Sequence, residues 1–123
     1  MTAEELLAKA AAAAQNAYAP YSNYFVGAAA LARDGRVFAG ANVENAAYPL
    51  GICAERSAIS RAAGEGLRPG DLAAIAITAS PCGGCRQWLH EWRVERVYFR
   101  RADRTIAEYA AGELLPETWD LPA

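Results

Sequence analysis

The chain has 123 residues, a length that fits one compact domain over 1–123 with a single hydrophobic core and leaves no room for a second core. Hydrophobic residues make up 54% of the sequence, which predicts a folded protein and excludes a disordered one. The formal net charge of −2 excludes a large positive field of the kind that holds a polynucleotide backbone, so a small ligand is favoured over nucleic acid.

The first half of the chain predicts one helix and a pair of strands. Thr2 and Glu5 form a capping box, and apolar residues at helical spacing then predict a helix over 3–16. The segment 19–22 contains a proline and separates this helix from the strands. Apolar sequence and turn residues then predict a buried strand, a turn and a returning strand over 25–32, 33–36 and 37–43.

The second half alternates helices with strands. Alanine-rich sequence after Cys53 predicts a buried helix that ends near Gly64, and a second helix is predicted over 83–92. Three further strands are predicted, over 72–78, 94–101 and 105–109, before an irregular tail from residue 117. There is no repeat, low-complexity tract or linker. The chain therefore predicts an α/β fold in which helices pack around one mixed sheet of about five strands.

The ends of the chain and its cysteines indicate where the protein works. The N-terminus lacks the basic and apolar regions of a signal peptide, and no apolar run reaches the roughly 20 residues needed to span a bilayer. We therefore expect a cytoplasmic protein with no membrane partner. Three cysteines are an odd number, so reduced thiols for a metal or for catalysis are favoured over a disulfide framework.

The three cysteines all lie at predicted helix starts. Cys82 and Cys85 are three residues apart, so on the first turn of a helix their thiols lie on one face and can fill two corners of a tetrahedron. Cys53, at the start of the other helix, can supply a third corner. A helix N-terminus stabilises negative charge, which favours the thiolates that zinc requires. The sequence therefore predicts a Zn²⁺ site made by three cysteines.

The fourth coordination position separates a structural zinc site from a catalytic one, because catalytic sites keep it for water. There is no fourth cysteine, and the one histidine, His90, follows Cys85 by five residues and points away from that face of the helix. An open position is therefore predicted. Zinc lowers the pKa of bound water from about 16 toward about 7, and the nearby Glu55 could move the proton. Together these parts favour hydrolytic deamination.

Each of these residues also has a purely structural interpretation. A lone Cys-x-x-Cys is often a redox or structural motif, Cys53 could be a buried apolar residue, and Glu55 could be an ordinary carboxylate at a helix start. Their joint occurrence favours the metal site. His90, among charged neighbours, is interpreted as a solvated helix residue.

Cys53-Ala54-Glu55 with the Pro-Cys-x-x-Cys at 81–85 matches the signature of zinc nucleobase deaminases in its all-cysteine version. Further blocks are found at 19–22 (APYS), 26–29 (VGAA), 42–45 (NVEN), 53–56 (CAER), 81–87 (PCGGCRQ) and 114–116 (LLP). With these blocks the chain resembles the short, homotetrameric cytidine deaminases from near residue 16 to residue 119. The resemblance implies a three-layer αβα fold. It also implies hydrolytic deamination of free cytidine or 2′-deoxycytidine in pyrimidine salvage. In the family's reaction zinc hydroxide attacks C4 of the base, and Glu55 is expected to shuttle the proton.

The resemblance also implies roles for residues around the metal and the sugar. It makes Cys53, Cys82 and Cys85 the zinc ligands, and it makes Arg56 a donor to the ligand thiolates that partly offsets their charge. Asn42 and Glu44 are expected to hold the ribose hydroxyls, although a polar strand edge would explain them too. Ala54 is expected in the same substrate-binding set.

Aromatic residues are expected near the base. Tyr24 occupies the position of a family aromatic, with Phe25 replacing the usual proline, and Trp119 stands where the family commonly places a Phe that reaches a neighbouring subunit's base. Core packing or anchoring of the C-terminus is the alternative for all three. The segment before Pro81 is also shorter than is common in the family, which affects the rim of the site.

Other functions compete with the deamination of free nucleosides. A deaminase of a cytosine nucleoside antibiotic such as blasticidin S shares the zinc motifs, but those relatives lack the carboxylate found here at Glu44. A polynucleotide deaminase is disfavoured by the acidic balance of the chain. A non-catalytic zinc module and a thiol redox role for Cys82 and Cys85 are the alternatives from other classes.

Overall fold

The computed structural model describes residues 1–122, so the last residue of the predicted irregular tail lies outside the described residues. Helices α1, α2 and α3 span Ala3–Ala14, Ala54–Gly64 and Gly83–Glu91, and the short 3₁₀ helices η1 and η2 span Tyr48–Leu50 and Ala111–Leu114. The strands β1 to β5 span Gly27–Ala32, Val37–Ala41, Leu72–Ile77, Arg96–Arg100 and Ile106–Tyr109. No helix among residues 1–122 is long and apolar enough to cross a membrane.

The strands form one mixed sheet of five strands in the order β2-β1-β3-β4-β5, which confirms the prediction. Strand β1 lies between β2 and β3 and is antiparallel to both, so that Ala28 pairs with Gly40 on one side and with Ile77 on the other. Strands β3 and β4 are parallel, and β5 returns antiparallel to β4. The start of β1 and the ends of β2 and β3 therefore meet at one edge of the sheet.

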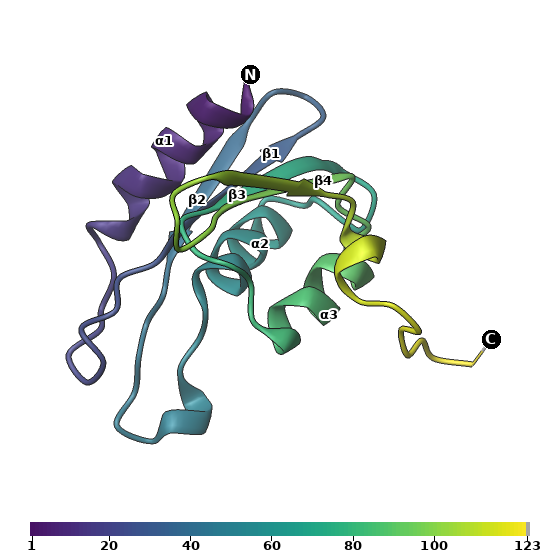
Figure 1. The fold of residues 1–123 in the computed structure, drawn as a ribbon. Coiled ribbons are helices and arrows are strands. Elements are labelled where there is room, and N and C mark those ends of the chain that lie inside the picture. Colours follow the sequence, from purple (N-terminus) through teal and green to yellow (C-terminus); the bar gives the residue numbers. More distant parts are fainter. Residues whose placement is uncertain (123) are drawn as a thin grey trace.

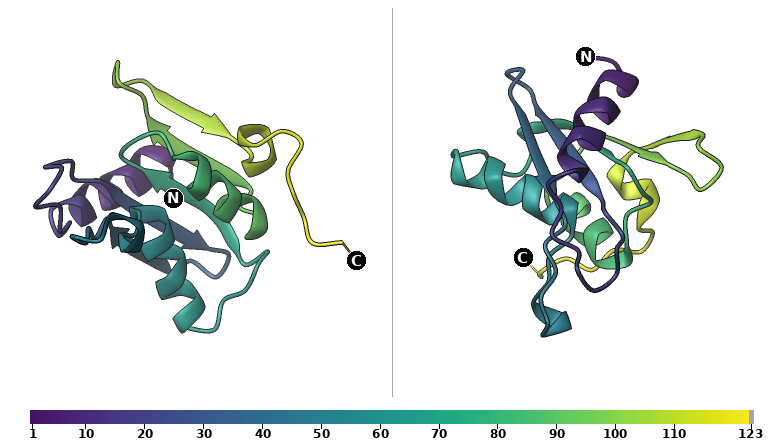
Figure 2. Two further views of the ribbon diagram at one scale, coloured as in Figure 1. Left: turned by 90° about the horizontal axis from the view of Figure 1, so that it is seen from below. Right: turned by 90° about the vertical axis from the view of Figure 1, so that its left-hand side faces the viewer.

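Helices cover both faces of the sheet, as the predicted αβα layers require (Figures 1 and 2). Helix α1 packs its buried leucines and Ala10 against one face, where Ala29, Ala74 and Ala76 point. Helices α2 and α3 pack Ile59 and Leu89 against the other face, into a cluster that includes alternate strand residues such as Ala28, Ala30, Ile75 and Ile77. The period of two along the strands thus divides the core into two layers.

Two glycines let the helices approach the strands at backbone distance. A Cβ added at Gly27 would lie 1.9 Å from the carbonyl oxygen of Ala10 in α1. A Cβ added at Gly40 would lie 2.4 Å from the backbone nitrogen of Ala58 in α2. Because α2 begins beside Cys53, the contact at Gly40 also fixes where that cysteine lies relative to the sheet.

We expect Gly40→Ala to destabilise the protein by about 2 kcal/mol or more, because backbone atoms of α2 must move to admit the methyl group and overpacking of a core costs on this scale. Urea unfolding monitored by circular dichroism measures the change. The matched control is Gly64→Ala at the end of the same helix, where nothing lies within 4 Å of the added Cβ. That variant should be neutral or slightly stabilised, and equal destabilisation of both would contradict the packing argument.

Several predicted elements are longer than those in the structure. Helix α1 ends at Ala14 instead of residue 16, and the first strand begins at Gly27 instead of residue 25. Strand β2 ends at Ala41 instead of residue 43 because Asn42 hydrogen-bonds to residues before β1 and Val43 makes isolated bridges elsewhere. The strand predicted over 94–101 is shortened to 96–100, and the two 3₁₀ helices lie in segments for which neither a helix nor a strand was predicted.

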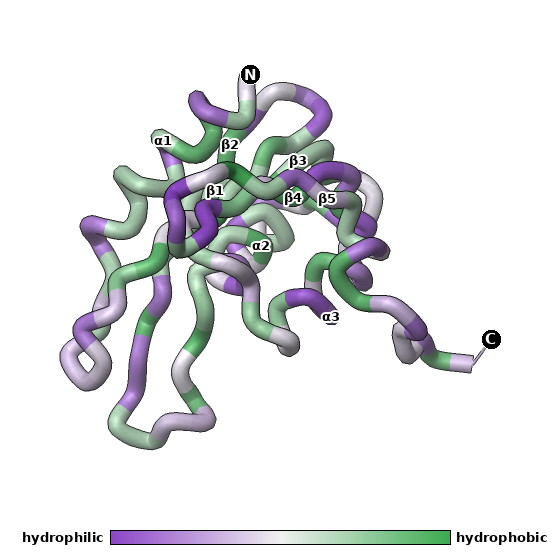
Figure 3. The backbone as a smooth tube through the Cα atoms, viewed as in Figure 1, coloured by the Kyte–Doolittle hydropathy of each residue, from purple (hydrophilic) through white to green (hydrophobic). Residues whose placement is uncertain are grey.

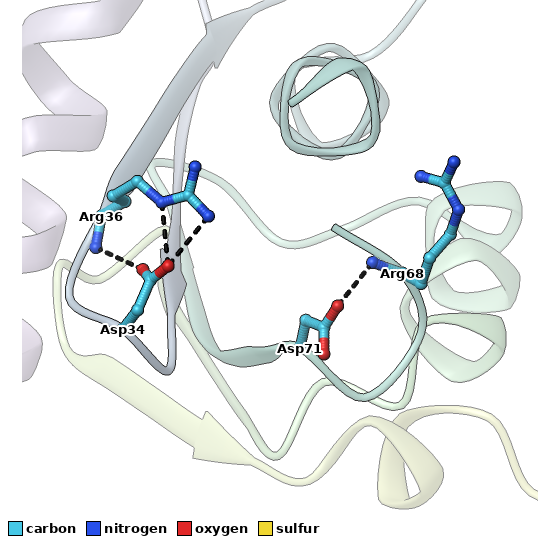
Figure 4. Close-up of polar contacts among 4 residues, drawn as sticks. All are labelled: Asp34, Arg36, Arg68 and Asp71. Carbon is cyan, nitrogen blue, oxygen red and sulfur yellow. Dashed lines mark hydrogen bonds and ion pairs between the residues drawn. The ribbon is translucent and has the colours of Figure 1, made fainter. Parts of the chain in front are cut away.

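Polar turns lie at the other ends of these strands, away from the place where the start of β1 and the ends of β2 and β3 meet (Figure 4). In the β1–β2 hairpin the Asp34 carboxylate accepts hydrogen bonds from the Arg36 backbone at 3.0 Å and from its Nε at 2.9 Å. Before β3, the Asp71 carboxylate accepts from the Arg68 backbone at 2.7 Å. These local contacts hold the turns, and the chemically active side chains lie at the other edge.

Candidate metal centre and substrate pocket

Helices α2 and α3 both begin at a cysteine, as the sequence predicts. Cys53 is the N-cap residue of α2 and Cys82 is the N-cap residue of α3. The Cys82 Sγ accepts a hydrogen bond from the backbone nitrogen of Cys85 at 3.4 Å, so the thiol itself caps its helix. Unpaired N–H groups at both helix starts therefore stabilise negative charge on sulfur.

The three thiols converge on one point. Their sulfur atoms all lie within 4.8 Å of one another, and the Cys53 and Cys82 Sγ atoms are 3.9 Å apart. Tetrahedral zinc with Zn–S bonds of about 2.3 Å separates its ligand sulfurs by about 3.8 Å. The cluster therefore fits zinc. Among the described residues no His, Asp or Glu joins this cluster, which leaves the fourth position of a tetrahedron to a ligand from solution.

The cysteines respond differently to their surroundings. The pKa of Cys53 is lowered to about 6, chiefly by the hydrogen bond from Cys85 and with help from Cys82 and the positive charge of Arg56. The pKa of Cys85 is raised, because that thiol donates to Cys53 and is fully buried. Zinc binds cysteines as thiolates, so its binding would release protons from the cluster.

Glu55 is the one buried charged residue in the part of the chain that the structure describes, with 3% of its surface exposed. Burial raises the pKa of its carboxyl group, and the negative charge of Cys53 raises it further. A carboxyl group with a raised pKa can give up and take back a proton nearer neutral pH. A carboxyl group in a cleft whose pKa is shifted by burial and by a neighbouring charge is a candidate functional group.

Arg56 extends from α2 to the first turn of α3. A Cβ added at Gly84 would lie 2.2 Å from its Nη2 atom, so the guanidinium group occupies the space that a side chain at this position would need. Its positive charge acts on all three cysteines, while its buried Nε has no hydrogen-bond partner among the described atoms. Arg56 therefore joins the two helix starts and places a cation beside the thiols.

A cavity of about 290 Å³ opens beside the thiols, at the edge of the sheet where β1, β2 and β3 meet. Cys53, Glu55 and Cys82 line one end, while Asn42 and Glu44 lie after β2. The remaining walls are made mainly of apolar or small residues, namely Tyr24, Val26, Val43, Gly51, Ile52, Ala54, Ala79 and Ser80. The cavity thus combines an apolar body with a few polar groups, which is typical of sites for small molecules.

Asn42 and Glu44 are held by the segment that precedes β1. The Asn42 Oδ1 accepts from the Val26 backbone at 2.9 Å, and its Nδ2 donates to the carbonyl oxygen of Tyr24 at 2.9 Å. The Glu44 carboxylate accepts from the backbone nitrogens of Tyr21 at 3.0 Å and Ser22 at 3.2 Å, and from the Ser22 hydroxyl. The hydrogen bond from Ser22 is the main cause that lowers the pKa of Glu44.

Comparison with known proteins relates this arrangement to a family. Residues 1–101 match the family described as "Cytidine and deoxycytidylate deaminase zinc-binding region". The chain belongs to this family. The family match and the geometry of the thiols together identify zinc as the cofactor.

Relatives in the family match nearly the whole chain. A cytidine deaminase from Halalkalibacterium halodurans is 44% identical over 94% of this chain and 92% of its own length. The crystal structure of cytidine deaminase from Burkholderia pseudomallei superposes with a TM-score of 0.91 at 44% identity, over 97% of this chain and 100% of that one. That from Mycobacterium tuberculosis superposes with a TM-score of 0.83 at 38% identity, over 98% and 99%. The predicted resemblance to cytidine deaminases is confirmed.

The other residues suggested by the family resemblance lie in different places. Tyr24 and Ala54 line the cavity, whereas Phe25 and Trp119 do not line it in this chain. Phe25 is 52% exposed and Trp119 is 68% exposed. His90 is away from the thiols, as predicted, but it is not simply solvated, because its Nε2 lies 2.8 Å from the Asp120 carboxylate.

The apolar walls of the cavity and Ser80 were not among the residues predicted from the sequence. Val26 and Val43 lie within the predicted strands, and Ile52 precedes Cys53. Their positions beside the motifs were the only sequence feature that pointed to the cavity. Ala79 and Ser80 lie in the loop after β3, which ends at Ile77. Their place at the edge of the sheet where three strands meet follows from topology, which the sequence alone does not state.

Proposed function

We propose that this protein deaminates free cytidine and 2′-deoxycytidine by hydrolysis, giving uridine or 2′-deoxyuridine and ammonia. The observation that carries the proposal is the position of the buried Glu55 beside three convergent thiols, at one end of a cavity that also holds Asn42 and Glu44. The matched relatives named cytidine deaminases support the same reaction.

Each end of the cavity has its own task in this proposal. Cys53, Cys82 and Cys85 would hold zinc, which when bound polarises water and lowers its pKa toward about 7. Glu55 takes a proton from the water that adds to C4 and gives it to N3 of the base. The same carboxylate then takes the proton of the new C4 hydroxyl and passes it to the 4-amino group, which leaves as ammonia when the C4–N bond breaks. One water enters and one ammonia departs, so a single proton-shuttling group is sufficient.

The polar groups of Asn42 and Glu44 suit the sugar. The lowered pKa of Glu44 keeps its carboxylate ionised, and ionised acceptors make the stronger hydrogen bonds to hydroxyl groups. Tyr24 and Ala54 line the same cavity, and in this proposal they contact the base. A carboxylate that binds the ribose hydroxyls favours cytidine and 2′-deoxycytidine over the antibiotic blasticidin S as substrates.

We expect Arg56→Gln to lower the affinity for zinc by about 10- to 100-fold, the usual cost of losing a partner outside the ligand shell. The reason is that the three thiolates would lose the cation beside them. Competition with a chromogenic chelator measures the affinity. The matched control is Arg61→Gln on the same helix, where the side chain donates at 2.7 Å to the carbonyl oxygen of Ala39. Equal loss in both variants would contradict a role for Arg56 at the metal.

A homotetramer with sites near subunit interfaces belongs to the same proposal. Two loops, 17–26 and 42–53, project beyond the sheet (Figure 1). Hydrophobic residues occur along both loops, among hydrophilic ones (Figure 3). Their exposed side chains include Tyr48 and Leu50, which are 75% and 70% exposed, and exposed apolar patches of this kind typically mark interfaces. The C-terminal segment extends away from the sheet (Figure 2). In the proposed tetramer Trp119, which belongs to this segment, would reach the base in a neighbouring subunit.

The deciding experiment measures zinc content, sedimentation and the ultraviolet absorbance of cytidine on one preparation. We expect about one zinc per chain, a particle of about four chains of 13.1 kDa, and loss of cytidine at a rate that does not depend on salt. 2′-Deoxycytidine, blasticidin S and a cytosine-containing single strand are compared in the same assay. Turnover of the antibiotic alone would favour the deaminase of a nucleoside antibiotic.

The alternatives from other classes have their own outcomes. Zinc that is needed for folding, with no turnover of any pyrimidine nucleoside, would indicate a non-catalytic zinc module. A metal-free protein whose Cys82 and Cys85 cycle between thiol and disulfide would indicate a redox role. A cytoplasmic location belongs to the same proposal, because three cysteines kept as thiols for a metal suit a reducing compartment.

A further inference from the structure

Ser22 lies at the centre of the contacts that hold the sugar end of the cavity. Its hydroxyl donates to the Glu44 carboxylate, and its oxygen accepts a hydrogen bond from the backbone nitrogen of Tyr24 at 3.0 Å. Its own backbone nitrogen donates to Glu44 at 3.2 Å. Ser22 is exposed and does not line the cavity itself, so its contacts act on the cavity through Glu44 and Tyr24.

The direction of the Ser22 hydroxyl is fixed by these contacts. A hydroxyl group has one proton to donate, and the Tyr24 N–H occupies one of its lone pairs. The proton is therefore left for Glu44, which accepts it with Oε2 while Oε1 accepts the two backbone N–H groups of Tyr21 and Ser22. The carboxylate is thus held through both oxygens, and its plane and rotamer are set before a ligand arrives.

Tyr24 has a second restraint that does not involve Ser22. Its carbonyl oxygen accepts from the Asn42 amide at 2.9 Å, and Asn42 is also bound to the Val26 backbone. Loss of the Ser22 hydroxyl would leave this restraint in place, because it involves only Tyr24, Asn42 and Val26. The effect of removing the hydroxyl should therefore fall on Glu44 and not on the part of the cavity that receives the base.

We propose that Ser22 is a positioning residue for substrate recognition, whose hydroxyl orients the Glu44 carboxylate toward the sugar hydroxyls of the nucleoside. This inference rests on the proposed function, because it assigns Glu44 to the sugar. Preorganised acceptors avoid the cost of ordering a side chain on binding, so the gain appears in affinity for substrates that carry the hydroxyls. Substrates without those hydroxyls gain nothing from it.

The test compares Ser22→Ala with the wild type on cytidine and on 2′,3′-dideoxycytidine, which lacks the 2′- and 3′-hydroxyl groups of the sugar. We expect KM for cytidine to rise about tenfold, the scale of a lost hydrogen bond to a charged group, while kcat changes less than about twofold. KM for the dideoxynucleoside should stay within about twofold of the wild type. Ser22→Thr, which keeps a hydroxyl, should restore most of the affinity for cytidine.

Two further variants separate positioning from a structural role. Ser60→Ala removes an exposed serine on α2, outside the cavity, and should leave both substrates unchanged. In a Glu44→Ala background, Ser22→Ala should have no further effect on KM for cytidine, because the group it orients is gone. Zinc content and sedimentation of every variant should match the wild type.

The outcomes distinguish this inference from the proposed function. A wild type that turns over no cytidine would overturn the proposed function and the sugar role together. A wild type that is active, with Ser22→Ala unchanged on cytidine or impaired equally on both substrates, would overturn the role of Ser22 alone. An additive effect of Ser22→Ala in the Glu44→Ala background would overturn it as well.

Discussion

Glu55→Gln is expected to retain zinc and the fold while lowering kcat for cytidine by at least about 10², the contribution of a general acid or base. The amide has the shape of the carboxyl group but cannot accept a proton and pass it on. Because Glu55 is 3% exposed, bulk water is poorly placed to take over its task. The loss should appear in kcat, measured by the ultraviolet change of cytidine, and the zinc content should be unchanged.

Glu65→Gln is the matched control for this variant. Glu65 caps the far end of the same helix and is exposed, so its neutralisation should leave kcat near normal. Near-normal activity of Glu55→Gln would contradict the assignment of Glu55 as the proton shuttle. Loss of zinc from Glu55→Gln would instead indicate that the carboxylate supports the metal centre and not the proton transfer.

The two helix starts of the metal centre could be located from the sequence because each is encoded locally. The approach of Cys53 to Cys82, 29 residues later, is a contact between distant segments that the deaminase signature supplied. Cys82 and Cys85 are one helical turn apart, and a helix start at each of Cys53 and Cys82 follows from the sequence that comes after it. The capping box at Thr2 and Glu5 is likewise local, and it is present in the structure. Contacts within one turn depend on few other residues, so they can be predicted before the fold is known.

Contacts between distant segments could not be predicted in this way. The apolar pattern continues through Val43, yet the strand ends at Ala41, because Asn42 and Glu44 bind a segment about 20 residues earlier in the chain. His90 was interpreted as solvated because its sequence neighbours are charged. Its partner Asp120 lies 30 residues away, on a tail that carries no periodic pattern.

Cys82→Ala is expected to lose zinc and, with it, all cytidine turnover. Two of the three thiols would remain, and the Cys85 backbone nitrogen would lose the sulfur that caps the start of α3. Removal of a metal ligand should cost more affinity than the about 10- to 100-fold expected for an outer partner such as Arg56. Zinc per chain after dialysis, measured by atomic emission, should fall from about one to near zero.

Ser80→Ala is the control, because Ser80 lies two residues before Cys82 and carries no thiol. It should retain its zinc, which would show that a change in this loop is not enough to release the metal. Unfolding of Cys82→Ala at a lower temperature than the wild type would indicate that zinc also joins the starts of α2 and α3. Full retention of zinc by Cys82→Ala would contradict a centre built from three thiols, and the mechanism assigned to Glu55 would then lose the polarised water on which it depends.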